Sequence, residues 1–178
     1  MSQVSKLNMV NAKLGATMPG QQTTRYIYDS VTAAAGQGTY NFFQTFAGKN
    51  DLQSNLTTNK LDSSESMVIK SIYLATNVTP GLSGHSNLNI TVGNQVVLKD
   101  FNVAFNCTSR GVSFDRLHSG LTSAILVEVR LLTDIVIPPQ VNFKATLELA
   151  EGSAVLEGEN ITLGLKGYGT IFSAGSTF

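Results

Sequence analysis

The residues of this sequence whose types could perform nucleophilic chemistry are one cysteine and a histidine that follows it. Cys107 is the only cysteine of the chain, and His118 lies on its C-terminal side. A cysteine nucleophile requires a lowered thiol pKa, a general base and a third group that orients the base. Cys107 stands in the stretch FNCTS, between apolar and polar residues, where we recognise no catalytic signature. We therefore expect Cys107 to be a small, partly buried structural residue that forms no intrachain disulfide.

Metal coordination by imidazole would depend on His85 and His118, the two histidines of the chain. They stand 33 positions apart, and the sequence has no H-x-H, H-x-x-x-H or C-x-x-C spacing of the kind that builds zinc sites. This pattern argues against a cupin, whose barrel strands carry several histidines. A calcium site made of loop oxygens needs no such motif and stays open, although no D-x-D-x-D-G run supports it.

Acid–base chemistry by paired carboxylates, as in glycosidases, needs no fixed spacing in the sequence. The chain contains no Trp, however, and sugar-processing clefts commonly use aromatic platforms. No glycine-rich phosphate loop precedes a helix, since GLSGHS at 81–86 connects two predicted strands. We accordingly assign no catalytic, cofactor-binding or metal-binding residue. We expect a protein that is not an enzyme and uses no cofactor.

The composition favours one domain that contacts other protein surfaces. At 178 residues the chain suits a single domain with room for a short arm, and 42% apolar residues are enough for a core. Charged residues make up 13%, about half the usual share, and the formal net charge is zero. Such a surface has little long-range repulsion, which favours association. No stretch approaches the length of a membrane span or a signal peptide, so we expect synthesis in a cytoplasm.

The elements that would position any site are strands. The chain lacks strand–helix alternation and a fixed-period repeat, and the Cys–Trp–Cys core of immunoglobulin domains is missing. Gly93-Asn94 between two apolar segments is a strong hairpin signal, and Pro138-Pro139 should end a strand. We predict an all-β fold, a single eight-stranded antiparallel jelly-roll β-sandwich with an extended N-terminal arm. The eight segments are 40–46, 67–76, 87–92, 95–101, 124–132, 134–140, 141–149 and 160–172, and 24–33 is a further strand of uncertain facing.

Alternation within these segments also predicts the core. In the segment 40–46, Phe42, Gln44 and Phe46 fall on one face and Phe43 on the other. The cleanest amphipathic strand is 141–149, where apolar and polar residues alternate throughout. The predicted core residues are Phe42, Phe46, Val68, Ile72, Leu88, Ile90, Leu126, Phe143, Leu147 and Leu163.

Two parts of different character make up the chain. Residues 1–23 read as an N-terminal arm that carries Lys6 and Lys13 and no acid, and residues 24–178 read as the jelly-roll domain. Two lysines are too few to indicate nucleic-acid binding, because each phosphate contact needs its own cation. Residues 145–160 carry four glutamates and no basic residue, so the two ends could pair between subunits. We expect the arm to contact neighbouring subunits or the interior of a particle.

The order of several motifs resembles a known family. The aromatic segment YNFFQTFAGK is followed by Thr58, Asn59 and Leu61, then by MVIKSIYL, IVIPPQVNFKATLEL and LKGYGTIF. Over residues 38–178 this order resembles the jelly-roll units of capsid proteins from tailless icosahedral phages, including the double-jelly-roll lineage of phages with an internal membrane. A double-jelly-roll protein needs two such units, whereas this chain has length for one. The chain is therefore more similar to a single-jelly-roll coat protein or a pentameric vertex protein.

The resemblance implies a virion structural protein without catalysis or cofactor. Its partners would be further copies of itself, in pentamers or other symmetric oligomers, and other capsid proteins, with no specific nucleic-acid recognition. Its location would be the virion, after synthesis in the host cytoplasm. The alternative is a carbohydrate- or receptor-binding β-sandwich, such as a spike or fibre tip. Exposed loop aromatics would favour that alternative, and Tyr168 and Phe172 are the candidates.

Deletion of residues 2–22 tests the predicted arm. We expect a folded domain with a nearly unchanged Tm that assembles poorly or into particles of the wrong size, because the arm contributes to contacts between subunits and not to the core. Circular dichroism and light scattering measure both effects. A truncated chain that cannot fold, or one that assembles normally, would contradict this role.

Overall fold

The computed structural model describes residues 20–76, 86–102, 109–110, 125–150 and 157–172. Within these ranges the chain contains strands and connections but no helix, and therefore no helix that could cross a membrane. The strands are β1 (Gly20–Thr32), β2 (Thr39–Phe42), β3 (Glu65–Thr76), β4 (Ser86–Val92), β5 (Gln95–Asn102), β6 (Ser109–Arg110), β7 (Ile125–Ile137), β8 (Phe143–Leu149) and β9 (Asn160–Phe172).

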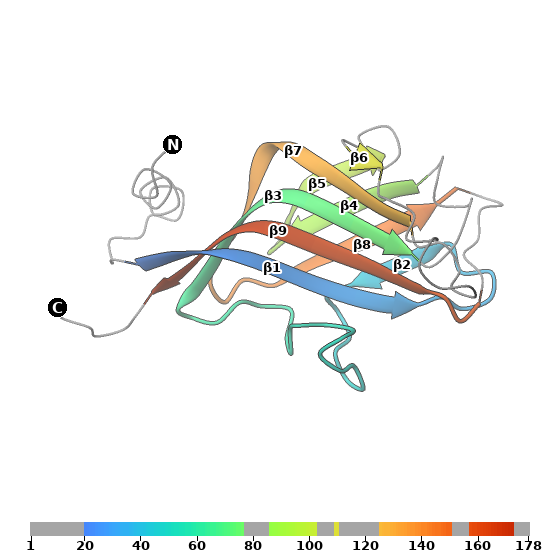
Figure 1. Cartoon of the computed structure of the whole chain (residues 1–178), viewed down its shortest axis with the longest axis horizontal. Helices are drawn as coiled ribbons and strands as arrows, with labels where there is room; N and C mark the ends of the chain where they lie inside the picture. The colour runs from blue at the N-terminus through green and yellow to red at the C-terminus, as the bar shows by residue number, and fades with distance from the viewer. Residues whose placement is uncertain (1–19, 77–85, 103–108, 111–124, 151–156, 173–178) are drawn as a thin grey trace, which may run out of the picture.

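The strands pair in a nested order that defines a jelly roll. All pairs are antiparallel, and β1 pairs with β9, β2 with β8, β3 with β7 and β4 with β5. The chain therefore forms one long hairpin, with its turn at Gly93, that is rolled up so that its ladders divide between two sheets. The pairs β3–β9, β4–β8 and β6–β7 complete the sheets in the orders β1-β9-β3-β7-β6 and β2-β8-β4-β5 (Figure 1). The all-β jelly-roll prediction is confirmed.

Besides the two-residue β6, the described sheets contain eight strands of 4 to 13 residues, and these are not the same eight segments that were predicted from the sequence. The segments 124–132 and 134–140 form one strand, β7, which ends at Ile137 before the two prolines. This merger leaves seven of the predicted segments, and β1 is the eighth strand, at the edge of the five-stranded sheet. Because β1 begins at Gly20, a deletion that tests the arm should stop at residue 19. Residues 1–19 lie outside the described part of the chain.

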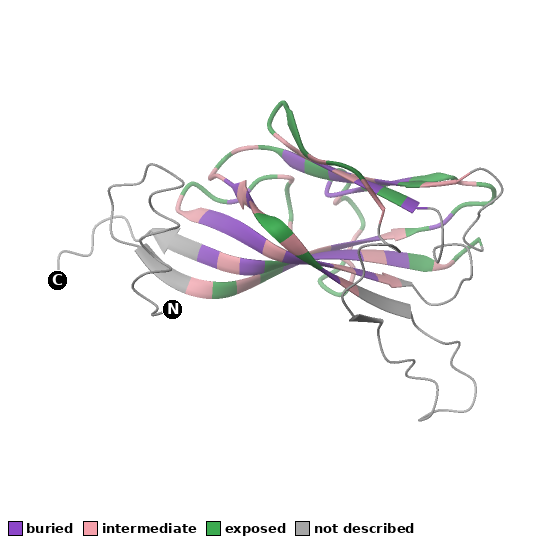
Figure 2. Cartoon of the chain, turned by 90° about the horizontal axis from the view of Figure 1, so that it is seen from above, coloured by how far each residue is buried: buried purple, intermediate pink, exposed green. Residues whose placement is uncertain are grey.

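Core packing follows the alternation of the amphipathic strands. In β8 the side chains of Phe143, Ala145 and Leu147 are buried between the sheets, while Lys144 and Glu148 face solvent. Buried residues lie along the strands of both layers (Figure 2). Of the predicted core residues, Leu126 falls outside the side chains that the structure describes, and Phe46 is only partly buried. The others are buried: Phe42, Val68, Ile72, Leu88, Ile90, Phe143, Leu147 and Leu163.

The facing predicted for residues 42–46 is wrong because the strand ends at Phe42. Phe42 and Phe43 are both fully buried, which strict alternation forbids. Phe43 has a positive φ of 60°, so the chain turns there and places both rings in the core. The buried Asp29 carboxylate holds this turn, since it accepts hydrogen bonds from the Phe43 amide at 2.7 Å and from Lys49 Nζ at 2.6 Å. The Phe43 ring then packs 5.3 Å from that of Phe143.

Truncation of Phe143 tests the packing between the sheets. We expect Phe143→Ala to lower the free energy of unfolding by about 3–5 kcal/mol, because the cavity beneath the ring cannot collapse fully. Lys144→Ala, at the adjacent solvent-facing position, should change it by about 0.5 kcal/mol or less. Urea denaturation of both variants measures the difference. Equal effects at the two positions would show that the facing of β8 is misassigned.

Candidate functional site

A register break crosses three strands of the five-stranded sheet at one level. On the β3–β7 ladder Ile69 pairs with Ile135 and Ser71 with Arg130, so one residue of β3 lies opposite four residues of β7, 131–134. On the β3–β9 ladder the same residue, Lys70, is the extra one. Extra residues bend a strand and increase its twist, and β7 bends sharply within its length (Figure 1).

The bulge presents a leucine to solvent. Leu132, near the middle of residues 131–134, is fully exposed at 105%, whereas Leu131 packs partly against the core. Lys70 Nζ lies 2.5 Å from Asp134 Oδ2 and ties the C-terminal end of the bulge to β3. Arg130, at the N-terminal end, is exposed. The exposed Leu132 side chain therefore lies between the basic Arg130 and the acidic Asp134 along β7.

The nearest edge of the other sheet is also apolar and exposed. Every residue of β5 is exposed or half-buried, including Val96 at 56% and Val97 at 40%. The edge is irregular, because the β4–β5 register shifts twice and Asp100 has a positive φ of 48°. The Asp100 amide donates to Asn89 Oδ1 at 2.7 Å, which fixes this irregular turn of the strand.

Between these two strands lies an apolar hollow of about 570 Å³, which we name the β5–β7 groove. It runs between the two sheets, on the side where each is at or near its edge. Contiguous exposed apolar surface of this kind marks sites of contact with other molecules. Its lining residues are Val97, Leu98 and Phe101 of β5 and Arg130, Leu131, Leu132, Thr133, Asp134, Ile135 and Val136 of β7.

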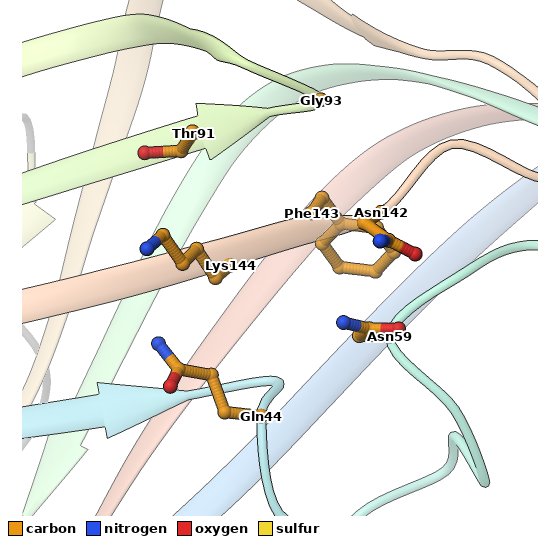
Figure 3. Close-up of a pocket in the computed structure, with 7 residues that line it drawn as sticks. All are labelled: Gln44, Asn59, Thr91, Gly93, Asn142, Phe143 and Lys144. Carbon is orange, nitrogen blue, oxygen red and sulfur yellow. The ribbon is translucent and has the colours of Figure 1, made fainter.

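A second hollow, of about 340 Å³, is polar. The described residues of its lining supply amides, a hydroxyl and one cation, and none of them carries a carboxylate. The Phe143 amide donates to the Asn59 carbonyl at 2.9 Å and the Gly93 amide to the Asn142 carbonyl at 2.7 Å, so backbone contacts fix its walls. Such donors suit a ligand that carries hydroxyl or carboxylate oxygens. The labelled residues in Figure 3 are Gln44, Asn59, Thr91, Gly93, Asn142, Phe143 and Lys144.

A tyrosine cluster on the five-stranded sheet is structural. The Tyr26 and Tyr73 rings meet edge to face at 5.9 Å, and Lys166 Nζ lies 5.5 Å from the Tyr73 ring centre. Tyr73 donates to Glu128 Oε1 at 2.7 Å. Burial raises the pKa of Tyr26, and the neighbouring tyrosines raise it further. Because a Cβ at Gly164 would overlap the Tyr26 ring, we interpret these contacts as packing across β9.

The residues weighed for chemistry are not brought together in the described structure. His85, Cys107 and His118 lie outside the described ranges. Within those ranges no group of three His, Cys, Asp or Glu side chains could hold a metal ion. Tyr168 and Phe172, the candidate loop aromatics, both belong to β9.

Sequence reasoning missed the β5–β7 groove, although two signals pointed to it. Val96, Val97 and Leu98 are consecutive apolar residues in a short strand that follows a tight turn. Leu131 and Leu132 are adjacent and interrupt the alternation of β7. Neighbouring residues of a strand point to opposite faces of the sheet, so two adjacent apolar residues are both buried only if both faces are covered. Here one face is uncovered, and Leu132 is exposed on it.

Comparison with known proteins adds a loose structural likeness. No protein family model matches the chain, and no curated protein matches it. Among solved structures it is similar to a chain of Desmodium yellow mottle tymovirus, at 11% identity and a TM-score of 0.31 over 89% of this chain and 93% of that one. It is also similar to turnip yellow mosaic virus, at 10% identity and a TM-score of 0.33 over 90% and 86%. The structure of the empty head of turnip yellow mosaic virus is similar at 11% identity and a TM-score of 0.32, over 89% of this chain and 85% of that one. The chain is an antiparallel jelly-roll protein on the strength of its own strand pairing.

Proposed function

We propose that this protein is a virion structural protein, a capsid subunit that acts by symmetric self-assembly. The observation that carries the proposal is the β5–β7 groove, with the fully exposed Leu132 beside it. Burial of one such side chain contributes about 1.5–3 kcal/mol. A protein that kept this surface in water would be prone to non-specific association, so a specific cover is expected.

The surface is also suited to a fixed contact geometry. The groove is formed by strands of both sheets, whose positions are set by core residues such as Ile135 and by the partly buried Phe101. Sites on rigid elements hold their geometry better than sites on loops. A closed shell requires a defined angle between subunits, and contact through strands provides it.

The low charge of the chain supports the same proposal. With 12 basic and 12 acidic residues, copies of the chain do not repel one another at long range. We extend the proposal to a coat or pentameric vertex subunit of a tailless icosahedral phage, located in the virion and in contact with other capsid proteins. Of the predicted arm, residues 1–23, we propose that residues 1–19 contact neighbours or the particle interior, because Gly20–Thr23 belong to β1 of the jelly-roll domain.

Replacement of Leu132 tests self-assembly through the groove. We expect Leu132→Asp to weaken association by about 2 kcal/mol or more, because a buried anchor is replaced by a charge. The matched control is Leu52→Asp, since Leu52 is 87% exposed but does not line the groove. Sedimentation velocity measures association. At a concentration where the parent is monomeric, thermal denaturation should give both variants the Tm of the parent. Normal assembly of Leu132→Asp, or equal loss in both variants, would contradict the proposal.

A second candidate function, a carbohydrate- or receptor-binding module, is favoured by the polar hollow around Lys144. Its amides and cation could bind an acidic sugar. On this reading the parent protein is a stable monomer that binds a sialylated glycan on an array, and Lys144→Ala loses that binding at unchanged Tm. An assembling protein with no glycan bound on the array would exclude this reading.

A further inference from the structure

We propose that two copies of the chain meet about a two-fold axis at residue 132, with their β7 bulges antiparallel. This inference rests on the proposed function and names the contact that self-assembly uses. The occupant of the β5–β7 groove is then the same surface of a second copy. Contacts of this type bury the same patch on both subunits and close without leaving a free end.

The charges of the bulge favour this arrangement. Arg130 and Asp134 stand two residues before and two residues after Leu132. In an antiparallel two-fold contact centred on residue 132, each residue meets the one that lies equally far on the other side of the centre. Arg130 of each copy therefore faces Asp134 of the other and would join the ion pair that Asp134 already forms with Lys70.

The carboxylate is held in position before any contact forms. Asp134 pairs with Lys70, and its side chain is only 14% exposed, so its place on the surface is fixed. The exposed Arg130 can reach a neighbouring copy from the other end of the bulge. Charge pairs at the rim of an interface determine orientation and rate more than affinity. The affinity would come from Leu132 and the apolar lining beside it.

The apolar surface is self-complementary in the same arrangement. Leu132 projects from the bulge directly beside the hollow formed by Val97, Leu98 and Phe101. When two such bulges lie antiparallel, the Leu132 side chains of the two copies contact each other. The pair then lies between β5 of one copy and β5 of the other. Leu52, which is also strongly exposed among the described residues, lines neither the β5–β7 groove nor the polar hollow.

The contact is formed by side chains and not by addition of a strand to β5. Strand addition needs a regular row of free amides and carbonyls along the edge. The β5 edge is interrupted by the positive φ of Asp100 and carries the exposed charges of Lys99 and Asp100. Irregular, charged edges of this kind oppose strand pairing.

Disulfide trapping tests the position of the axis. In a Cys107→Ser background, Leu132→Cys places two cysteines at the axis, within the Cα separation of about 4.4–6.8 Å that a disulfide needs. Under mild oxidation we expect a disulfide-linked dimer in high yield on a non-reducing gel, with the 132–132 link identified by mass spectrometry. Leu52→Cys in the same background should stay monomeric on the gel. Absence of the 132–132 link in a protein that associates would overturn the inference.

Complementary charge changes test the antiparallel pairing independently. Arg130→Glu alone, and Asp134→Lys made together with Lys70→Glu so that an ion pair is kept within the chain, each give two like-charge pairs between copies. Each variant should weaken self-association about tenfold or more. A mixture of the two variants forms a dimer in which both pairs are again of opposite charge, so association should return to within about threefold of the parent. Sedimentation velocity with one labelled variant measures the mixed dimer. Variants that fail alone and fail in the mixture would overturn the inference.

The outcomes separate this inference from the proposed function. A parent protein that does not self-associate at any concentration removes both. A parent that assembles without the 132–132 link and without rescue in the mixture keeps the proposed function and removes only the two-fold contact. A 132–132 link that is absent in the full chain and appears on deletion of residues 2–19 would show that these residues occupy the groove, and it would also overturn the inference.

Discussion

The described structure depends on a close approach of two backbones at Gly167. A Cβ at this position of β9 would overlap the carbonyl oxygen of Val68 on β3, so only glycine fits. The approach lies where Lys70 is inserted into β3 and where β7 inserts residues 131–134. One residue without a side chain therefore permits the register break of the sheet, and the register break exposes Leu132.

The edge positions of β5 and β7, together with their irregular registers, produce the β5–β7 groove. Rolling of the nested hairpin leaves β5 at an edge of its sheet and β7 close to an edge of the other. The bulge of β7 and the shifted register of β5 keep these edges from presenting a regular ladder. What remains exposed is apolar side-chain surface, which is suited to packing against a defined partner and unsuited to open-ended strand addition.

Local patterns predicted the elements that local forces determine. Strict alternation located β4 and β8, and Gly93-Asn94 located the hairpin between β4 and β5. The sequence could not place the turn at Phe43, because its positive φ depends on the Asp29 carboxylate, fourteen residues away in sequence. Nor could it place the groove, because the bulge of β7 depends on β3 and β9. Both misses arise from contacts between segments that are distant in sequence. The adjacent Leu131 and Leu132 signal an interrupted alternation, but not which strand lies opposite them.

The nesting of the strands has a kinetic consequence. The outermost ladder joins Gly20 to Phe172, and Gly167 on the same late strand is required for the register break next to Lys70. Pairs so far apart in sequence form slowly, since loop closure precedes any gain from contact. During synthesis the five-stranded sheet cannot be completed before β9 has left the ribosome. The surface around Leu132 therefore matures last, and a nascent chain has no finished contact to offer to its neighbours.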